Sequence, residues 1–193
     1  DRSSAEIGVK ALLSDRKINS YAIIKSLIDL NNQRKEIQKK IFNEADLALN
    51  SSKNSIIVFS EKWHKGIVGI VASNLVDKYN KPSIVLTKEK NNLVGSVRTA
   101  KGINVLEILN KCSAFLTKYG GHKSAAGLSL AGENLNSFQD LFEKEVVKVS
   151  NELNNDKQIT IDLVLSIDEI NYIFYRTIMR FAPFGLGLSL IHI

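Results

Sequence analysis

The sequence predicts an α/β domain in which helices cover the faces of a mixed sheet. Short apolar segments rich in β-branched residues alternate with segments whose apolar residues recur at three- and four-residue steps. With 193 residues, 44% of them hydrophobic, the chain is long enough for one sizeable core with appendages. No stretch of about 18 apolar residues occurs, so no membrane-spanning segment is expected.

The apolar segments predict four strands and three helices in the central part of the chain. The strands are expected at residues 55–59, 83–87, 93–98 and 126–130, and the helices at residues 66–79, 104–118 and 134–151. Helices that follow strands at this spacing favour a mixed sheet with helices on its faces. The third helix is expected to pack on the same sheet.

Two further patterns flank this central part. Residues 19–49 have helical periodicity around a polar middle, which is longer than most globular helices and is typical of a solvent-bridging helix. Residues 4–14 form a shorter helical pattern, which we interpret as the end of a domain that precedes it.

At the other end, residues 158–166 alternate apolar and polar side chains and predict a half-buried strand. Ser166 and Glu169 have the spacing of a capping box, which predicts a helix through about residue 181 that Pro183 ends. The apolar face of this strand and helix is expected to be exposed.

The segment Gly-Gly-His-Lys-Ser-Ala-Ala-Gly at residues 120–127 has a composition unlike that of a core. Gly120 and Gly121 allow a ligand to approach bare backbone N–H groups, and such groups in a turn bind anions. His122 would then touch a phosphate. The alternative is a glycine-capped helix end that leads into a small-residue strand.

Arg98 is the only arginine between Arg34 and Arg176, in a chain that otherwise uses lysine. A planar guanidinium suits bidentate contact with a phosphate better than an ammonium does. Ser96 lies two residues earlier, so both side chains face the same way on an extended strand. The alternative is a surface salt bridge beside a strand-end serine.

Trp63 and His64 lie in a loop between an expected strand and a helix that begins near Gly66. An aromatic face or an imidazole at such a position could meet a ligand. Either side chain could instead pack against the domain, with Gly66 and Gly69 letting the helix lie close to the sheet.

The positive charge of the chain is concentrated around these motifs. Residues 51–130 hold twelve Lys or Arg and four Asp or Glu, so their net charge of +8 exceeds the +6 of the whole chain. This distribution fits a polyanionic partner, although the chain is generally rich in lysine and asparagine. Four acids and two histidines in this window cannot assemble a two-metal phosphodiesterase site. The single cysteine, Cys112, is interpreted as a small core residue.

The order W-H-x-G-I-V-G-I-V-A-S, then G-S-V-R, then G-G-H-x-x-A-A-G-L resembles the DHHA1 domain of the RecJ family of single-stranded-DNA-specific exonucleases, within the DHH phosphoesterase superfamily. The resemblance extends from about residue 3 to residue 187. The glycine-histidine motif alone is also shared with small-substrate DHH phosphoesterases and with the C-terminal part of alanyl-tRNA synthetases. Trp63-His64 and the helix after them narrow the resemblance to the RecJ family.

The resemblance implies a division of the chain into four parts. Residues 1–50 would be the end of a DHH domain and a long linker helix, and residues 51–153 the substrate-binding DHHA1 domain. Residues 154–187 would begin an OB-type module. Residues 188–193 depart from the family pattern and would be a truncated or non-native tail.

The resemblance also implies roles for the motif residues. His122 would act at the scissile phosphate as a donor or an acid, and Ser96 and Arg98 would hold the 5′ phosphate end. The substrate-binding set it suggests comprises Trp63, His64, Ser96, Arg98, Gly120, Gly121 and His122. Divalent metal, Mn²⁺ or Mg²⁺, would be bound by the DHH domain, which is expected to be absent here, and none is expected in this chain.

By this resemblance the chain is part of a cytoplasmic, monomeric 5′-to-3′ exonuclease that hydrolyses single-stranded DNA in repair and recombination. Alone it should bind the strand weakly and cut nothing. The alternatives are a DHH-family phosphoesterase for short oligonucleotides or cyclic dinucleotides, and a noncatalytic nucleic-acid-binding module.

Overall fold

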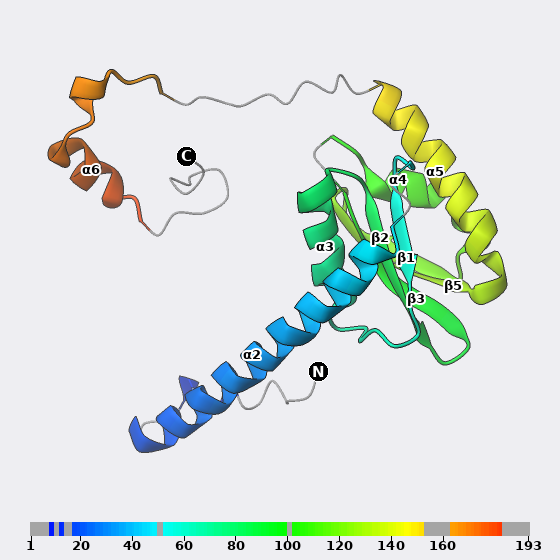
Figure 1. The fold of residues 1–193 in the computed structure, drawn as a ribbon, viewed down its shortest axis with the longest axis horizontal. Helices are drawn as coiled ribbons and strands as arrows, with labels where there is room; N and C mark the ends of the chain where they lie inside the picture. The colour runs from blue at the N-terminus through cyan, green and yellow to red at the C-terminus, as the bar shows by residue number, and fades with distance from the viewer. Residues whose placement is uncertain are drawn as a thin grey trace. The chain divides into compact units, whose positions relative to one another are not determined.

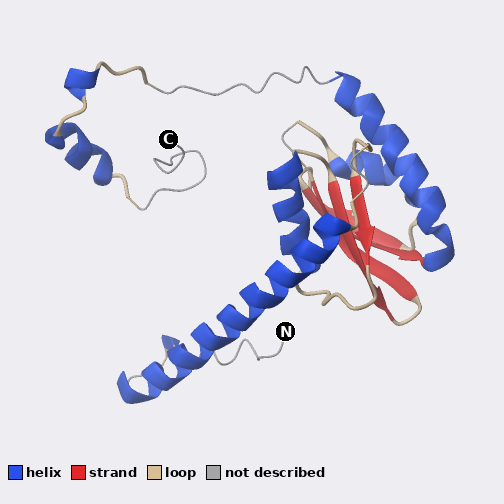
Figure 2. Cartoon of the chain, in the orientation of Figure 1, coloured by secondary structure: helices blue, strands red, loops and turns tan. Residues whose placement is uncertain are grey.

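The computed structural model describes residues 8–9, 12–13, 17–49, 52–99, 102–152 and 163–182. The chain divides into two compact units, residues 1–155 and 156–193, which are described separately. The first unit contains a five-stranded mixed sheet with helices on both faces, as Figures 1 and 2 show. The predicted fold class is therefore confirmed for this unit.

The sheet has the strand order β1-β2-β3-β5-β4. Its strands are β1 (Ile56–Phe59), β2 (Ser83–Glu89), β3 (Asn92–Arg98), β4 (Lys118–Gly121) and β5 (Ala125–Ala131). β1 and β2 are parallel, joined by a helical crossover, and the remaining neighbours are antiparallel.

Each face of the sheet is covered by its own pair of helices. α2 (Lys17–Leu47) and α3 (Val68–Tyr79) pack on one face, and α4 (Val105–Lys111) and α5 (Leu135–Glu152) on the other. Strand alternation divides the core accordingly: Ile56 and Val58 face α2 and α3, whereas Ile57 lies on the other side. The expected packing of the third helix, α5, on the same sheet is confirmed.

The prediction of a helix over residues 104–118 was wrong beyond Lys111. The helix α4 is followed by a short 3₁₀ turn, Ser113–Phe115, and then by the edge strand β4. The sequence of β4 is Lys-Tyr-Gly-Gly, which carries little intrinsic strand preference. This strand forms because it pairs with β5, and the local sequence pattern could not predict that pairing.

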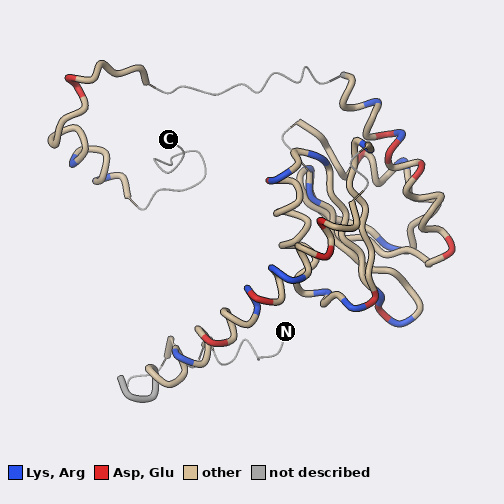
Figure 3. Tube along the Cα trace, viewed as in Figure 1, with Lys and Arg blue, Asp and Glu red and all other residues tan. Residues whose placement is uncertain are grey.

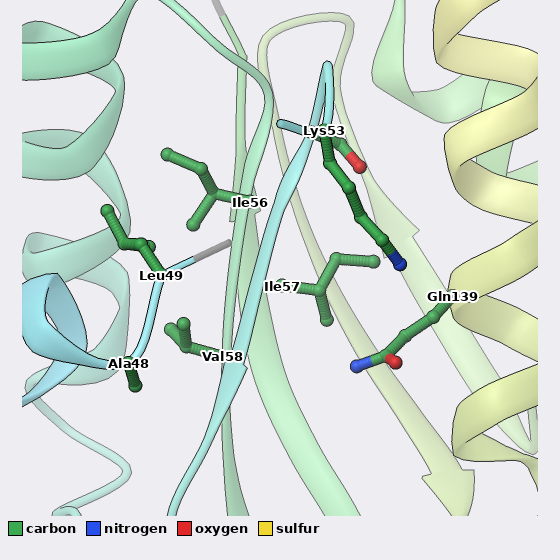
Figure 4. Close-up of a pocket in the computed structure, with 8 residues that line it drawn as sticks. Ala48, Leu49, Lys53, Ile56, Ile57, Val58 and Gln139 are labelled. Carbon is green, nitrogen blue, oxygen red and sulfur yellow. The ribbon is translucent and has the colours of Figure 1, made fainter. Parts of the chain in front are cut away.

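Edge strand β1 is covered at the sheet margin by the end of α2 and by α5. Figure 4 shows Ile56 and Val58 pointing toward Leu49, and Ile57 pointing toward Gln139 of α5. A small pocket of about 150 Å³ lies among these side chains. Its lining combines the buried side chains of Ile56 and Val58 with half-buried polar side chains at the sheet margin, such as Lys53 and Gln139.

The second unit begins its described part at residue 163. Ser166 and Glu169 form the predicted capping box, but it begins a 3₁₀ turn, Ile167–Glu169, and Asn171 caps a separate helix α6 (Tyr172–Met179). Residues 163–166 belong to no strand, which contradicts the end of the predicted strand. No partner strand lies in the described part of this unit. The rest of that strand, Pro183 and the tail at residues 188–193 lie outside the described residues.

Most apolar side chains in the described part of this second unit are exposed, as expected. Ile173 on α6 is 76% exposed, and no residue of that helix is buried. Across the described ranges of the chain, no helix is both long enough and apolar enough to cross a bilayer.

Candidate phosphate-binding site

Strand β3 directs Ser96 and Arg98 toward helix α3. A Cβ placed on Gly69 of α3 would lie 3.2 Å from Ser96 Oγ and 3.1 Å from Arg98 Nη2. Both side chains therefore lie on one face of the sheet, as strand alternation predicts, and both touch the first turn of the helix. Two of the three sequence motifs thus meet at one point.

The N-terminus of α3 adds positive potential at this point. Its N-cap residue is Ile67, which provides no side-chain hydrogen bond to the first turn. Uncapped N–H groups and the helix dipole make such an end favourable for an anion. Arg98 has no carboxylate partner among the described residues, and its Nη1 donates to the Val97 carbonyl at 2.8 Å. Nη2 and the helix N-terminus thus form a positive corner.

The β4–β5 hairpin brings the third motif to the same end of the sheet. Ala125 is the register partner of Arg98, and the His122 backbone N–H donates to the Ala125 carbonyl at 2.7 Å to close the turn. Gly121 has a φ of 156°, and a Cβ there would lie 2.3 Å from the Ala125 carbonyl oxygen. Glycine is therefore required at position 121 by the backbone. The His122 side chain is exposed.

Gly120 and Gly127 are register partners across β4 and β5, and neither is required by the fold. Both have ordinary φ values, and a Cβ on Gly120 would meet nothing within 4 Å. A Cβ on Gly127 would meet only the Gly95 carbonyl oxygen, at 3.9 Å. Both glycines are exposed and lie beside Ser96, the other register partner of Gly127. They leave bare backbone next to the positive corner, and the role of Gly127 was not foreseen from the sequence.

The structure reduces the positive charge available around these motifs. Of the twelve basic residues in the window, Lys65, Lys78, Lys88 and Lys111 form ion pairs with carboxylates. Lys118 and Lys123, at the two ends of the glycine-histidine segment, have no such partner in the described part of the chain and are exposed. Figure 3 marks the basic and acidic positions along the trace.

Trp63 and His64 occupy different environments. Trp63 is only 6% exposed, donates its indole N–H to Glu44 of α2 at 2.8 Å, and accepts at its carbonyl a bond from Thr87 Oγ1 at 2.6 Å. The packing interpretation therefore applies to Trp63, and this burial does not support direct contact with a substrate. His64 is exposed, and its Nδ1 accepts the Gly66 backbone N–H at 3.1 Å.

Titratable groups with shifted pKa values lie away from this corner and support the fold. Hydrogen bonds from Lys148 and Lys111 lower the pKa of Glu145 on α5, and these bonds outweigh the effect of its burial. Burial, together with the charge of Glu145, raises the pKa of Cys112 to about 11, so its thiol is protonated at neutral pH. Cys112 is a core residue, as its sequence context predicts.

The described residues do not offer a ligand set for a metal ion. No group of three or more His, Cys, Asp or Glu side chains gathers closely enough among them to hold one. The corner at Arg98 is therefore suited to binding and orienting an anion by donors and positive charge alone.

Residues 52–148 match the model of the DHHA1 domain family. The chain is 30% identical over 190 residues to the single-stranded-DNA-specific exonuclease RecJ of Bacillus subtilis, an alignment that covers 94% of this chain and 24% of that protein. It is 28% identical to RecJ of Haemophilus influenzae, covering 94% of this chain and 34% of that protein. The chain thus spans between a quarter and about a third of the length of these relatives.

Solved structures agree with the fold. The crystal structure of RecJ in complex with Mg²⁺ from Thermus thermophilus superposes with a TM-score of 0.82 at 22% identity, covering 96% of this chain and 29% of that one. The Mn²⁺ complex from the same organism gives a TM-score of 0.68 at 25% identity, covering 75% and 22%. Because the family model matches half of the sequence and the RecJ relatives align over nearly all of it, the chain is a RecJ-like member of the DHHA1 domain family.

Proposed function

We propose that this chain positions the strand in a 5′-to-3′ exonuclease that hydrolyses single-stranded DNA. The observation that carries the proposal is the meeting of Gly69, Ser96 and Arg98 at the N-terminus of α3. A terminal phosphate needs donors and positive charge from several directions, and this corner supplies both. The family membership and the exonuclease activity of the named relatives support a nucleic-acid substrate.

In this proposal Arg98 and the first turn of α3 hold the 5′ phosphate, and the Ser96 hydroxyl donates a hydrogen bond to it. His122, exposed at the hairpin turn, donates to a phosphate oxygen near the scissile bond and stabilises the charge that develops there. Gly120 and Gly127 let the sugar-phosphate backbone approach the strands closely. The exposed Lys118 and Lys123 attract the polyanion.

The hydrolysis itself belongs to the DHH domain of the parent enzyme in this proposal. Divalent ions bound there, Mn²⁺ or Mg²⁺, would activate the attacking water. The described residues of this chain do not fit such ions, so their work is to bind and orient the strand. We therefore propose that the chain alone binds DNA weakly and cleaves none. Repair and recombination in the cytoplasm are the proposed setting.

Binding of a 5′-phosphorylated single-stranded oligonucleotide tests the proposal. The comparison is with the same strand bearing a 5′ hydroxyl and with the duplex, at two salt concentrations and without metal. We expect a preference for the 5′-phosphorylated single strand, weakened by Arg98→Ala and by His122→Ala. Arg98→Lys should recover only part of the affinity, because an ammonium cannot make the bidentate contact.

Lys144→Ala is the matched control. Lys144 is exposed on α5, on the opposite face of the sheet, and its loss removes the same charge. Equal losses of affinity in Arg98→Ala and Lys144→Ala would reduce the site to a general basic surface. Preferential binding of a dinucleotide or of structured RNA would favour the small-substrate phosphoesterase or the noncatalytic module.

A further inference from the structure

A groove separate from the Arg98 corner runs between α2 and the segment that precedes α3. Its volume is about 750 Å³, within the range of ligand sites. Its floor is apolar, formed by Leu27, Leu30, Ile37, Ile41 and Ile67. The α2 residues of this floor belong to none of the three sequence motifs, and they reach the groove because they recur at helical spacing on one face of the helix.

The rim of the groove is positively charged. Arg34, Lys40 and Lys62 line it, and the last two have no carboxylate partner among the described residues. Glu44 is the one carboxylate in the lining, and it already accepts the Trp63 indole N–H. Three cationic side chains and one carboxylate give the lining of the groove a net charge of +2 beside its apolar floor.

Two planar groups at this rim are held in place by their neighbours. The guanidinium of Arg34 donates to Asn31 Oδ1 at 3.0 and 3.1 Å and to Gln38 Oε1 at 3.0 Å. Because the Gly66 N–H donates to Nδ1 of His64, the neutral imidazole carries its proton on Nε2, which is left to donate. Flat guanidinium and imidazole groups stack on nucleobases and also contact phosphates.

The groove begins within one helical turn of the phosphate-binding corner. Gly66 and Ile67 line the groove, and Gly69 touches Arg98. Ile67 is the N-cap residue of α3 and lies two residues before Gly69, so the lining of the groove adjoins the helix N-terminus that touches Arg98. A strand whose end is held at Arg98 can continue into the groove.

We propose that the groove between α2 and residues 62–67 binds the nucleotides that follow the terminal phosphate of a single-stranded nucleic acid. The bases lie on the apolar floor and against Arg34, and the phosphates meet Lys40, Lys62 and His64. This inference rests on the proposed function for the position of the strand end. A duplex does not fit, because its bases are stacked and paired inside the helix. An acidic peptide would match the charge, but it has no reason to start at a phosphate corner.

A length series of 5′-phosphorylated oligonucleotides, from two to twelve nucleotides, tests this inference by fluorescence anisotropy with the 193-residue chain. In Arg34→Ala and Lys62→Ala we expect the affinity for the eight-nucleotide strand to fall about 5-fold or more, as loss of a stacked base does. The affinity for the dinucleotide should not change. Arg34→Lys should retain part of the charge contribution and lose the stacking.

Lys39→Ala is the charge-matched control, because Lys39 is exposed on α2 and does not line the groove. Its affinities should match the unaltered chain at every length, and circular dichroism should show equal helix content in all variants. An eight-nucleotide strand with abasic positions after the first nucleotide should lose the sensitivity to Arg34→Ala.

Unchanged affinity for the eight-nucleotide strand in both groove variants would overturn the inference, and so would equal losses for the two- and eight-nucleotide strands. Undiminished binding of the abasic strand, or competition by an acidic peptide for the groove alone, would also overturn it. Failure of the proposed function would look different from failure of the groove. In that case Arg98→Ala would bind oligonucleotides of every length with the affinity of the unaltered chain.

Discussion

The indole N–H of Trp63 donates to Oε2 of Glu44 at 2.8 Å and thereby connects α2 to the segment before α3. Trp63 is buried, and Thr87 at the end of β2 donates to its carbonyl. One residue thus joins a helix, a strand and the loop that leads to the phosphate-binding corner.

Trp63→Ala should destabilise the fold by about 3 to 5 kcal/mol, because it removes a large buried ring. Trp63→Phe keeps most of the packing and loses the hydrogen bond to Glu44, so its cost should be about 1 kcal/mol. Urea denaturation followed by circular dichroism measures both. Wild-type stability in Trp63→Ala would contradict the role of Trp63 as a packing anchor.

Gly69→Ala should weaken binding of the 5′ phosphate and leave the fold intact. The added methyl would lie 3.1 Å from Arg98 Nη2, so the guanidinium must move. Alanine is also a better helix former than glycine by about 1 kcal/mol, which offsets the crowding. Thermal denaturation should therefore show unchanged stability, whereas oligonucleotide binding should show a loss of affinity for the 5′-phosphorylated strand. A loss of affinity for 5′-phosphate and 5′-hydroxyl strands alike would show that Arg98 is not the affected group.

The three glycines of the β4–β5 hairpin should behave differently when replaced by alanine. Gly120→Ala and Gly127→Ala should leave stability unchanged or raise it by about 0.5 to 1 kcal/mol, because glycine weakens a strand. Both should reduce DNA binding by obstructing the bare backbone. Gly121→Ala should destabilise the fold, because its Cβ would meet the Ala125 carbonyl oxygen at 2.3 Å. Normal DNA binding by Gly120→Ala and Gly127→Ala would contradict a close approach of the DNA backbone to strands β4 and β5.

Glu145 should make stability depend on pH in the acid range. Its pKa is lowered in the folded state by hydrogen bonds from Lys148 and Lys111, from an ordinary value of 4.5. The stabilisation is therefore complete above pH 4.5 and is lost as the pH falls through the folded pKa. Glu145→Gln should lower the melting temperature most at pH 7, and the difference from the unaltered chain should shrink toward pH 3.

Glu133→Gln serves as the control for this experiment, because Glu133 is exposed and forms no ion pair among the described residues. Its melting temperature should follow that of the unaltered chain across the pH range. A difference between Glu145→Gln and the unaltered chain that stays constant down to pH 3 would show that ionisation of Glu145 does not contribute.

Periodicity was enough to predict most elements of the first unit, because α2, α3, α5 and the strands β1, β2, β3 and β5 all contribute apolar side chains to the core. It could not predict β4, whose Lys-Tyr-Gly-Gly sequence acquires strand geometry only by pairing with β5. The strand expected over residues 158–166 shows the converse, since its described end, residues 163–166, has no partner strand among the described residues. Alternation indicates which face a strand would bury and does not supply the neighbour.

The candidate site shows the same division. The sequence predicts that Ser96 and Arg98 lie on the same face of the sheet, because residues two apart on a strand point to the same side. Their contact with Gly69 depends on how α3 crosses the sheet, and the exposure of Gly127 depends on register. The burial of Trp63 required Glu44, a partner 19 residues away that no local pattern identifies.

Among the described residues, two polar links hold α2 to the rest of the unit, and both lie near the C-terminal end of the helix. One is Glu44 with Trp63, and the other is Asp46 with Lys78 and Tyr79. Tyr21 lies 23 residues before Glu44, about 35 Å along the axis at 1.5 Å per residue. The N-terminal part of α2 can therefore tilt about the anchored C-terminal end, where Glu44 and Asp46 lie. A tilt of about 10° about this end would move Tyr21 by about 6 Å, and the motion would reach the segment before α3 through Trp63 and the end of α3 through Lys78 and Tyr79.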